Sequence, residues 1–188
     1  ALGALAAALR DPVEEVGREA AKALWSIGPS AVPTLLDAVA DPTPRVRAWS
    51  RMALGRIEPA PTEAAGKVAD GLRDENVLVR RAAADALGRM GPAAHAAVGS
   101  LARALSDPDV EVRRLASWAI ARTGREAERA MSSLILALAD ADDQVRLAVR
   151  QAVRRGLVTR EALLALAAQR RGRLKYLIAE ELKGDGAT

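Results

Sequence analysis

Apolar residues recur along the chain with the spacing of amphipathic helices, and the helices come in pairs. Leu101, Ala104 and Leu105 share one helix face at the i, i+3, i+4 spacing. The segment that follows repeats apolar residues at i, i+4, i+7 and i+8, namely Val112, Ala116, Ala119 and Ile120. A short polar stretch separates the two segments. The pattern therefore predicts two antiparallel helices joined by a tight turn.

The turn between the helices carries a motif that occurs five times. An aspartate precedes each second helix, at steps of 30, 33, 33 and 33 residues: Asp11, Asp41, Asp74, Asp107 and Asp140. Five positions after each aspartate stands a valine: Val16, Val46, Val79, Val112 and Val145. The next residue is Gly17 in the first copy and arginine in the others: Arg47, Arg80, Arg113 and Arg146. Self-similarity at this period is typical of stacked repeats, so we expect an all-α solenoid.

Local signals mark the helix ends. In the fourth copy Asp107 is suited to cap the second helix, and Pro108 to occupy its first position, where the missing N–H costs nothing. Gly91 and Pro92 form a typical helix stop. We expect helices at residues 3–10, 13–27, 32–40, 43–57, 62–73, 76–90, 94–106, 109–123, 127–139, 142–155, 160–169 and 173–183.

The repeats are expected to form a single domain over residues 1–188. Their approximate boundaries are 1–30, 31–62, 63–95, 96–128 and 129–157, followed by a C-terminal pair of capping helices at 158–188. The capping segment lacks the aspartate motif but keeps amphipathic spacing. This is typical of a terminal cap with a more polar outer face.

The composition agrees with a helical core and excludes several kinds of site. The 188 residues are 50% hydrophobic and 28% charged, with no Phe. The apolar residues are mostly Ala, Leu and Val, which let helices approach closely. The absence of Cys excludes disulfides, thiolate nucleophiles and cysteine-based metal sites. No apolar run approaches ~18 residues, so we expect no insertion into a membrane.

The recurring motif, with an Ala-Leu-Gly-like segment after each copy, resembles HEAT repeats over about residues 3–155. It is similar to the short bacterial and archaeal repeats first grouped with phycobilisome lyases, which are also the basis of consensus-designed binding scaffolds. The resemblance implies an armadillo-like α-solenoid with first helices on the convex side and second helices on the concave side. It also implies a structural ladder between repeats, formed by Asp41, Arg47, Asp74, Arg80, Asp107, Arg113, Asp140 and Arg146. Gly17 interrupts this ladder, as suits a terminal repeat.

The second helices should expose one set of positions to the concave groove. Counted from the motif valine, these are the second, third, fifth, sixth and tenth residues, and the tenth is arginine in four copies. The candidate ligand-binding residues are Trp49, Arg51, Met52, Arg56, Arg81, Arg89, Arg114, Trp118, Arg122, Arg150 and Arg155. Exposed Trp beside Arg is the combination of binding hot spots. We therefore expect Trp49 and Trp118 to be exposed and Arg114 to face solvent.

Each of these features also has a structural interpretation. A cation in the last turn of a helix favours the helix dipole, which would account for the arginine at the tenth position. Trp49 and Trp118 would equally serve as packing between neighbouring repeats. Trp25 takes the column held by Gly55 and Gly88, and is expected to cover the open N-terminal end.

The net charge of +4 is unevenly distributed. Residues 1–40 have a net charge of −2, and residues 41–145 have a net charge of 0. Residues 146–188 carry ten basic and four acidic residues, a net charge of +6. Long-range attraction would favour an acidic partner at this end, and the alternative is a solvated, arginine-rich cap.

The residues give little support to catalysis. His95 is the only histidine and stands in an Ala-rich segment. The acidic residues Asp107, Asp109, Asp142 and Asp143 stand at helix starts, where carboxylates cap helices. No phosphate-binding loop or zinc-type spacing occurs. We therefore expect a protein that is not an enzyme and has no cofactor or metal, a scaffold that binds an acidic peptide or protein segment in its groove.

Two alternatives belong to other function classes. HEAT-like DNA glycosylases hold duplex DNA in a basic groove with Trp and a catalytic Asp, and Asp85 is the one aspartate in a groove column here. The other alternative is a phycobilin-lyase-like protein for chromophore attachment, or a chaperone for it. We expect a cytoplasmic protein, with a truncated or processed N-terminus because Ala1 already lies inside the repeat pattern. The sequence indicates no oligomeric state.

Overall fold

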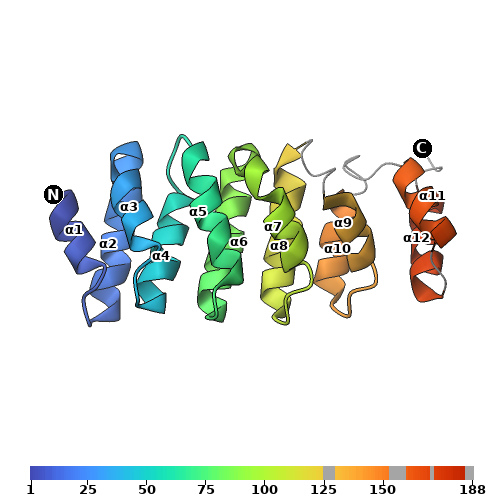
Figure 1. Cartoon of the computed structure of the whole chain (residues 1–188), viewed down its shortest axis with the longest axis horizontal. Coiled ribbons are helices and arrows are strands. Elements are labelled where there is room, and N and C mark those ends of the chain that lie inside the picture. The colour runs from blue at the N-terminus through green and yellow to red at the C-terminus, as the bar shows by residue number, and fades with distance from the viewer. Residues whose placement is uncertain (125–129, 153–159, 170–171, 185–188) are drawn as a thin grey trace.

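Helices form one elongated row in the computed structural model, from α1 at the N-terminus to α12 near the C-terminus (Figure 1). The structure describes residues 1–124, 130–152, 160–169 and 172–184. Within these ranges all regular structure is α-helix or 3-10 helix, without a strand. The predicted all-α solenoid is confirmed.

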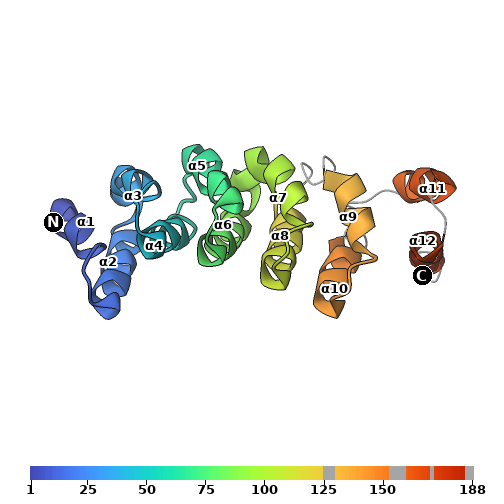
Figure 2. The same cartoon turned by 60° about the horizontal axis from the view of Figure 1, so that its bottom comes forward.

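The helices lie in two layers, which Figure 2 shows as two rows. The first helices of the repeats are α1 (Leu2–Ala8), α3 (Val32–Ala38), α5 (Ala65–Asp70), α7 (Val98–Ala104) and α9 (Met131–Ala137). The second helices are α2 (Glu14–Ile27), α4 (Pro44–Leu54), α6 (Val77–Met90), α8 (Val110–Arg122) and α10 (Asp143–Ala152). The last pair is α11 (Arg160–Gln169) and α12 (Arg173–Gly184), and α11 contacts α9.

Short 3-10 segments shorten several first helices relative to the prediction. The expected helix at 62–73 consists of a 3-10 turn at Thr62–Ala64, then α5, then a 3-10 turn at Gly71–Arg73. The expected helix at 94–106 is 3-10 up to Ala97 and becomes α7 only at Val98. Such turns commonly complete the ends of α-helices. A further 3-10 turn, Gly28–Ala31, precedes α3.

The cap of the second helices differs from the prediction. Asp109, and not Asp107, caps α8, since its carboxylate accepts a hydrogen bond from the Val112 N–H at 3.0 Å. Asp107 instead accepts from the Asp109 N–H at 2.9 Å, and Pro108 lies within this turn. The same carboxylate-to-turn bond occurs at the other motif aspartates, Asp11, Asp41, Asp74 and Asp140. The motif aspartate therefore orders the turn that precedes the helix.

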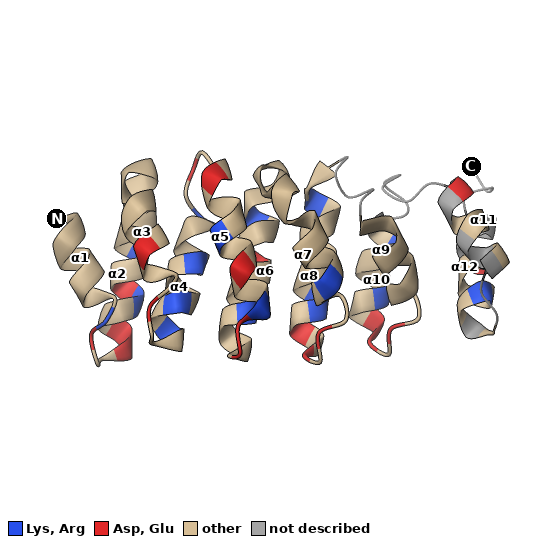
Figure 3. Cartoon of the chain, in the orientation of Figure 1, with Lys and Arg blue, Asp and Glu red and all other residues tan. Residues whose placement is uncertain are grey.

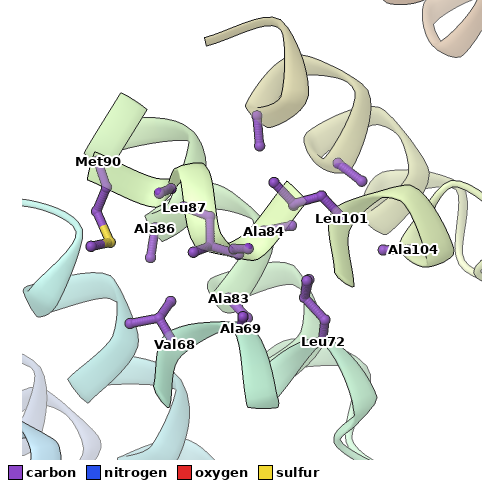
Figure 4. Packing of buried hydrophobic residues seen from close by; sticks show 14 of the residues in the cluster. Val68, Ala69, Leu72, Ala83, Ala84, Ala86, Leu87, Met90, Leu101 and Ala104 are labelled. Carbon is purple, nitrogen blue, oxygen red and sulfur yellow. The ribbon is translucent and has the colours of Figure 1, made fainter. Parts of the chain in front are cut away.

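Small apolar side chains fill the space between the two layers. Figure 4 shows part of this cluster around α6, with Val68, Leu72, Leu87 and Leu101 among its members. The second helices approach one another closely because glycine and alanine line their contacts. A Cβ added to Gly55 would lie only 2.5 Å from the Cα of Ala86 on the next second helix.

Arginine–aspartate pairs link the turns of successive repeats, and we call these pairs the primary ladder. Arg47 donates from Nε and Nη2 to the two carboxylate oxygens of Asp74, at 2.8 Å each. The pairs Arg80–Asp107 and Arg113–Asp140 have the same bidentate geometry. The Nη1 of each arginine also donates to the backbone carbonyl of the aspartate in its own turn. In Figure 3 these charges gather at the lower ends of the second helices.

The first repeat replaces the missing ladder arginine from another position. Arg10 lies just before the motif, and its Nε donates to Oδ2 of Asp41 at 2.6 Å. The space beside Gly17 is taken by the ring of Trp49, since a Cβ on Gly17 would lie 2.2 Å from a ring carbon. Glycine at position 17 therefore makes room for Trp49, and an arginine there would collide with it.

Gly55→Ala should lower the free energy of unfolding by about 2 kcal/mol, because its Cβ would meet the backbone of α6. Gly66→Ala is the matched control, since an added Cβ there meets nothing within 4 Å. This control should be neutral or stabilising by up to ~1 kcal/mol, because Ala favours the helix. Urea titrations measure both effects. A Gly55→Ala variant as stable as the parent would contradict the close packing of α4 on α6.

Candidate functional site

Two neighbouring hollows lie over α4, α6 and α8, and we call this face the second-helix surface. Each hollow has a volume of about 440 Å³. The first, which we call the apolar pocket, has an apolar lining of Ala48, Trp49, Met52, Leu78, Ala82 and Leu115. The second, which we call the arginine pocket, is lined by Gly55, Arg56, Glu58, Arg89, Trp118 and Arg122. The surface therefore offers apolar and cationic contacts side by side.

The apolar pocket lies over the N-terminal parts of α4, α6 and α8. Leu78 is 58% exposed, and Met52 and Leu115 are half-buried. Charged side chains of both signs also line this pocket, among them Arg81 and Glu111. An exposed apolar patch bordered by polar groups is typical of a binding surface.

The prediction that Trp49 is exposed is wrong. The side chain is only 7% exposed, because its ring fills the space beside Gly17 of α2. The Arg45 guanidinium covers the ring at 5.1 Å from its centroid. Trp49 therefore forms a wall of the apolar pocket and packs two repeats together.

The placement of Arg51 in the groove is also wrong. Arg51 is 4% exposed, and its Nη1 donates to the carbonyls of Val39, at the end of α3, and Arg47. Burial lowers its pKa. The fifth position after the motif valine is also buried in three other copies, as Ala21, Ala84 and Ser117, and is half-buried in the last copy, as Arg150. Arg51 therefore stabilises the fold, and its Nη1 bond to Val39 compensates the C-terminal end of a helix dipole.

The arginine pocket brings together three arginines from three successive second-helix ends. Arg56 donates from Nη1 to the Met52 carbonyl at 3.1 Å, and this nitrogen lies 3.9 Å from Oδ2 of Asp85. Arg89 donates from Nε to the same Asp85 oxygen at 2.8 Å. Arg122 donates from Nε to the Gly88 carbonyl at 2.7 Å. One aspartate is thus shared by two of the three guanidinium groups.

The electrostatics of this pocket favour an additional anion. Burial, and then the nearby charge of Arg89, lower the pKa of Arg56. Within the described residues, the Nη groups of Arg89 and Arg122 donate to no protein atom. A ligand carboxylate could bond to these nitrogens and offset the repulsion between the arginines.

Aromatic rings flank the arginine pocket. Trp118 is 36% exposed and lies on Gly88, where a Cβ would be 1.9 Å from a ring carbon. The guanidinium of Arg122 lies over this ring, 5.2 Å from its centroid, and Arg56 lies over Trp25 at 5.1 Å. Such stacking holds the guanidinium groups in place while their edges remain free to donate.

Arg81 and Arg114 lie on the second-helix surface, where they form further pairs that we call the secondary ladder. Arg81 donates to both oxygens of Asp109 at 2.9 and 2.6 Å. Arg114 binds Asp142 with the same distances. The prediction that Arg114 simply faces solvent is therefore wrong. Hydrogen bonds from Arg81 lower the pKa of Asp109 to about 2.

Sequence reasoning missed two contributors to the site, Trp25 and the bridging role of Asp85. The i, i+4 spacing of Asp85 and Arg89 is a signal that could have identified this pair.

Two predicted groove residues lie near the C-terminal end of the repeats. Arg150 is half-buried on α10, and Arg155 lies outside the described residues. In the described part of the chain there is no cluster of His and acidic residues suited to a metal, and no helix long and apolar enough to cross a membrane.

Comparisons with known proteins agree with the repeat architecture. A protein-family model described as HEAT repeats matches residues 2–69 and 67–154. Curated protein sequences gave no match. A solved structure of the CpcE–CpcF complex of phycocyanin lyase, from Nostoc sp. PCC7120, is 26% identical with a TM-score of 0.70, over 81% of this chain and 97% of that chain.

Two less similar structures share the fold alone. A designed armadillo repeat protein, in complex with the peptide (KR)4, is 18% identical with a TM-score of 0.58, over 97% of this chain and 98% of that one. A chain of the Kap95:Nup1 complex is 16% identical with a TM-score of 0.64, over 96% of this chain and 29% of that one.

Arg113→Ala is expected to lower the free energy of unfolding more than Arg114→Ala does. The Arg113 side chain is 17% exposed and also bonds the carbonyls of its own turn, so its loss should cost about 2–3 kcal/mol. Arg114 is 38% exposed, so its pair with Asp142 should contribute no more than about 1 kcal/mol. Denaturant midpoints compare the two variants. Equal midpoints would contradict the greater role of the primary ladder.

Arg81→Gln should raise the pKa of Asp109 from about 2 toward its ordinary value. The depressed pKa means that this pair stabilises the fold above the unfolded-state pKa, near ~4, and that the contribution is lost as pH falls toward 2. The stability difference between parent and variant should therefore be present at pH 7, shrink as the pH falls below ~4, and vanish once the pH is below about 2. Carboxyl NMR titration and urea unfolding measure these effects, with Arg73→Gln as control. A pH-independent difference would contradict this assignment.

Proposed function

The chain belongs to the HEAT-repeat family, and we propose that it is a non-catalytic scaffold that binds an acidic peptide or protein segment on its second-helix surface. The family fold is a repeat scaffold typical of binding proteins. The observation that carries the proposal is the arginine pocket, where Arg56, Arg89 and Arg122 meet beside an apolar pocket. Planar guanidinium groups bind carboxylates in a bidentate way, so this pocket suits an acidic group.

The pattern of charges favours a peptide over nucleic acid. Arg81 and Arg114 lie on the same surface, but Asp109 and Asp142 neutralise them. Glu111 adds a further negative charge beside the apolar pocket. A phosphate backbone needs a row of available cations, and these carboxylates would repel it. The arginine pocket is small, which fits a single carboxylate better than a phosphate backbone.

Likeness to the CpcE–CpcF complex supports a second candidate, a lyase-like or chaperone role toward a bilin chromophore. A bilin is a long conjugated molecule with carboxylates, so the apolar pocket would hold its rings and the arginine pocket its acid groups. Phycocyanobilin titrated into the protein should then shift its visible absorption band. An unchanged spectrum at millimolar protein would remove this candidate.

Arg89→Ala/Arg122→Ala should weaken the binding of acidic peptides about tenfold or more, because it removes the guanidinium groups that have free Nη donors. Arg73→Ala/Arg103→Ala is the matched control, with the same change of charge on exposed residues of the first-helix layer. An array of acidic peptides and their lysine-substituted counterparts, probed with all three proteins, compares them.

Folding of the groove double variant is checked by its melting temperature. Loss of the Arg122 bond to the Gly88 carbonyl should cost only about 1 kcal/mol. If the parent and both double variants bind the same peptides equally well, the arginines serve only the helix ends and the proposed surface is wrong.

A further inference from the structure

We infer that the apolar pocket and the arginine pocket form one two-part recognition site, for a peptide that carries an aliphatic side chain and a carboxylate about three residues apart. The inference rests on the proposed function and names the motif that the partner must have. Both pockets are built on α6, α8 and the segment formed by α4 and the turn that follows it, and Asp85, which lines the apolar pocket, binds Arg89 of the arginine pocket. A ligand that fills one pocket is therefore held beside the other.

The apolar pocket selects an aliphatic side chain. Its lining includes the exposed Leu78 and the half-buried Met52 and Leu115, and Ala48 and Ala82 leave space between them. Desolvation of these groups would favour a Leu, Ile or Met side chain. The charges beside the pocket have both signs, so the apolar lining is its selective feature.

Helix geometry sets the separation of the two pockets. On α6 the lining residues Ala82 and Arg89 are seven positions apart, and on α8 Leu115 and Arg122 have the same separation. At 1.5 Å of rise per residue, seven positions correspond to roughly 10 Å. An extended peptide advances about 3.3–3.6 Å per residue, so three residues span this distance. The bound peptide would thus run along the second helices and not across the stack.

Asp85 acts as an internal competitor for the ligand carboxylate. It accepts from Nε of Arg89 and lies 3.9 Å from Nη1 of Arg56, so it already neutralises part of the pocket. The ligand would bind the remaining Nη donors of Arg89 and Arg122. Removing the charge of Asp85 should therefore strengthen the binding of acidic peptides, whereas removing the charge of Arg89 should weaken it.

A display library of random nine-residue peptides, with both termini blocked, tests the motif. The parent should enrich peptides with Leu, Ile or Met three residues from Asp or Glu. Leu78→Glu should abolish the aliphatic preference and keep the acidic one, while Arg89→Ala should do the reverse. Leu78 and Arg89 are both exposed, so these variants should fold. Arg103→Ala, on the first-helix layer, should enrich the same peptides as the parent.

Titration of one enriched peptide into the protein then tests whether Asp85 competes with the carboxylate of the peptide. Asp85→Asn should tighten its binding severalfold, and replacing the acidic residue of the peptide with Asn should remove this gain. A second peptide ends at the position of the acidic residue, with a free C-terminal carboxylate in place of the acidic side chain. Comparing the two peptides distinguishes an acidic side chain from a chain end as the source of the charge. Both sources supply the same chemistry to the arginine pocket.

The outcomes separate the inference from the proposed function. Enriched peptides that lack this spacing, or that bind Leu78→Glu and Arg89→Ala as well as the parent, would overturn the two-part site. A loss of affinity in Asp85→Asn would also overturn it. If no peptide is enriched, or if duplex DNA binds more tightly than any peptide, the proposed function itself fails.

Discussion

The bidentate arginine–aspartate pair between successive turns is the interaction on which the rest of the stack depends. The aspartate binds the backbone of its own turn and the guanidinium of the preceding repeat at once, as Asp107 does. The planar guanidinium group of arginine forms two hydrogen bonds to one carboxylate only over a narrow range of relative orientations. Each pair therefore fixes the start of one helix and its rotation against the previous helix. The alignment of Arg56, Arg89 and Arg122 over one pocket follows from that constraint.

The second constraint is the small volume available between the second helices. Gly55 packs against the backbone of α6, and two of the tryptophans lie where the neighbouring residue is glycine. Trp49 lies against Gly17, and Trp118 lies against Gly88. These two rings bound the apolar and arginine pockets respectively. The shape of the candidate site is thus a result of close helix packing, with a few large residues placed where that packing is relaxed.

Periodicity was enough to predict the helices, and the resemblance of the repeated motif to HEAT repeats implied that its aspartates and arginines pair. Side-chain direction at the edge of a helix was harder to predict. Arg51 turns inward because Gly71 and the end of α3 leave a space for it, and Trp49 is covered because Gly17 is small. The two glycines lie in neighbouring repeats, so the spacing of residues around Arg51 and Trp49 gives no signal of them. The pairing of Arg81 with Asp109 likewise depends on how two repeats dock, 28 residues apart.

The contact between Trp118 and Gly88 means that the repeats are not interchangeable modules. Trp118 requires a glycine nine positions after the motif valine of the repeat before it, and its own repeat carries Ala121 at that position. A tandem duplication of the repeat that contains Trp118 would place the copied ring against a methyl group where the original meets none. The backbone repeats periodically, but the side-chain contacts between neighbouring repeats differ and fit only one order of the repeats. Growth or shortening of such an array by whole repeats would thus need a compensating substitution at each new junction.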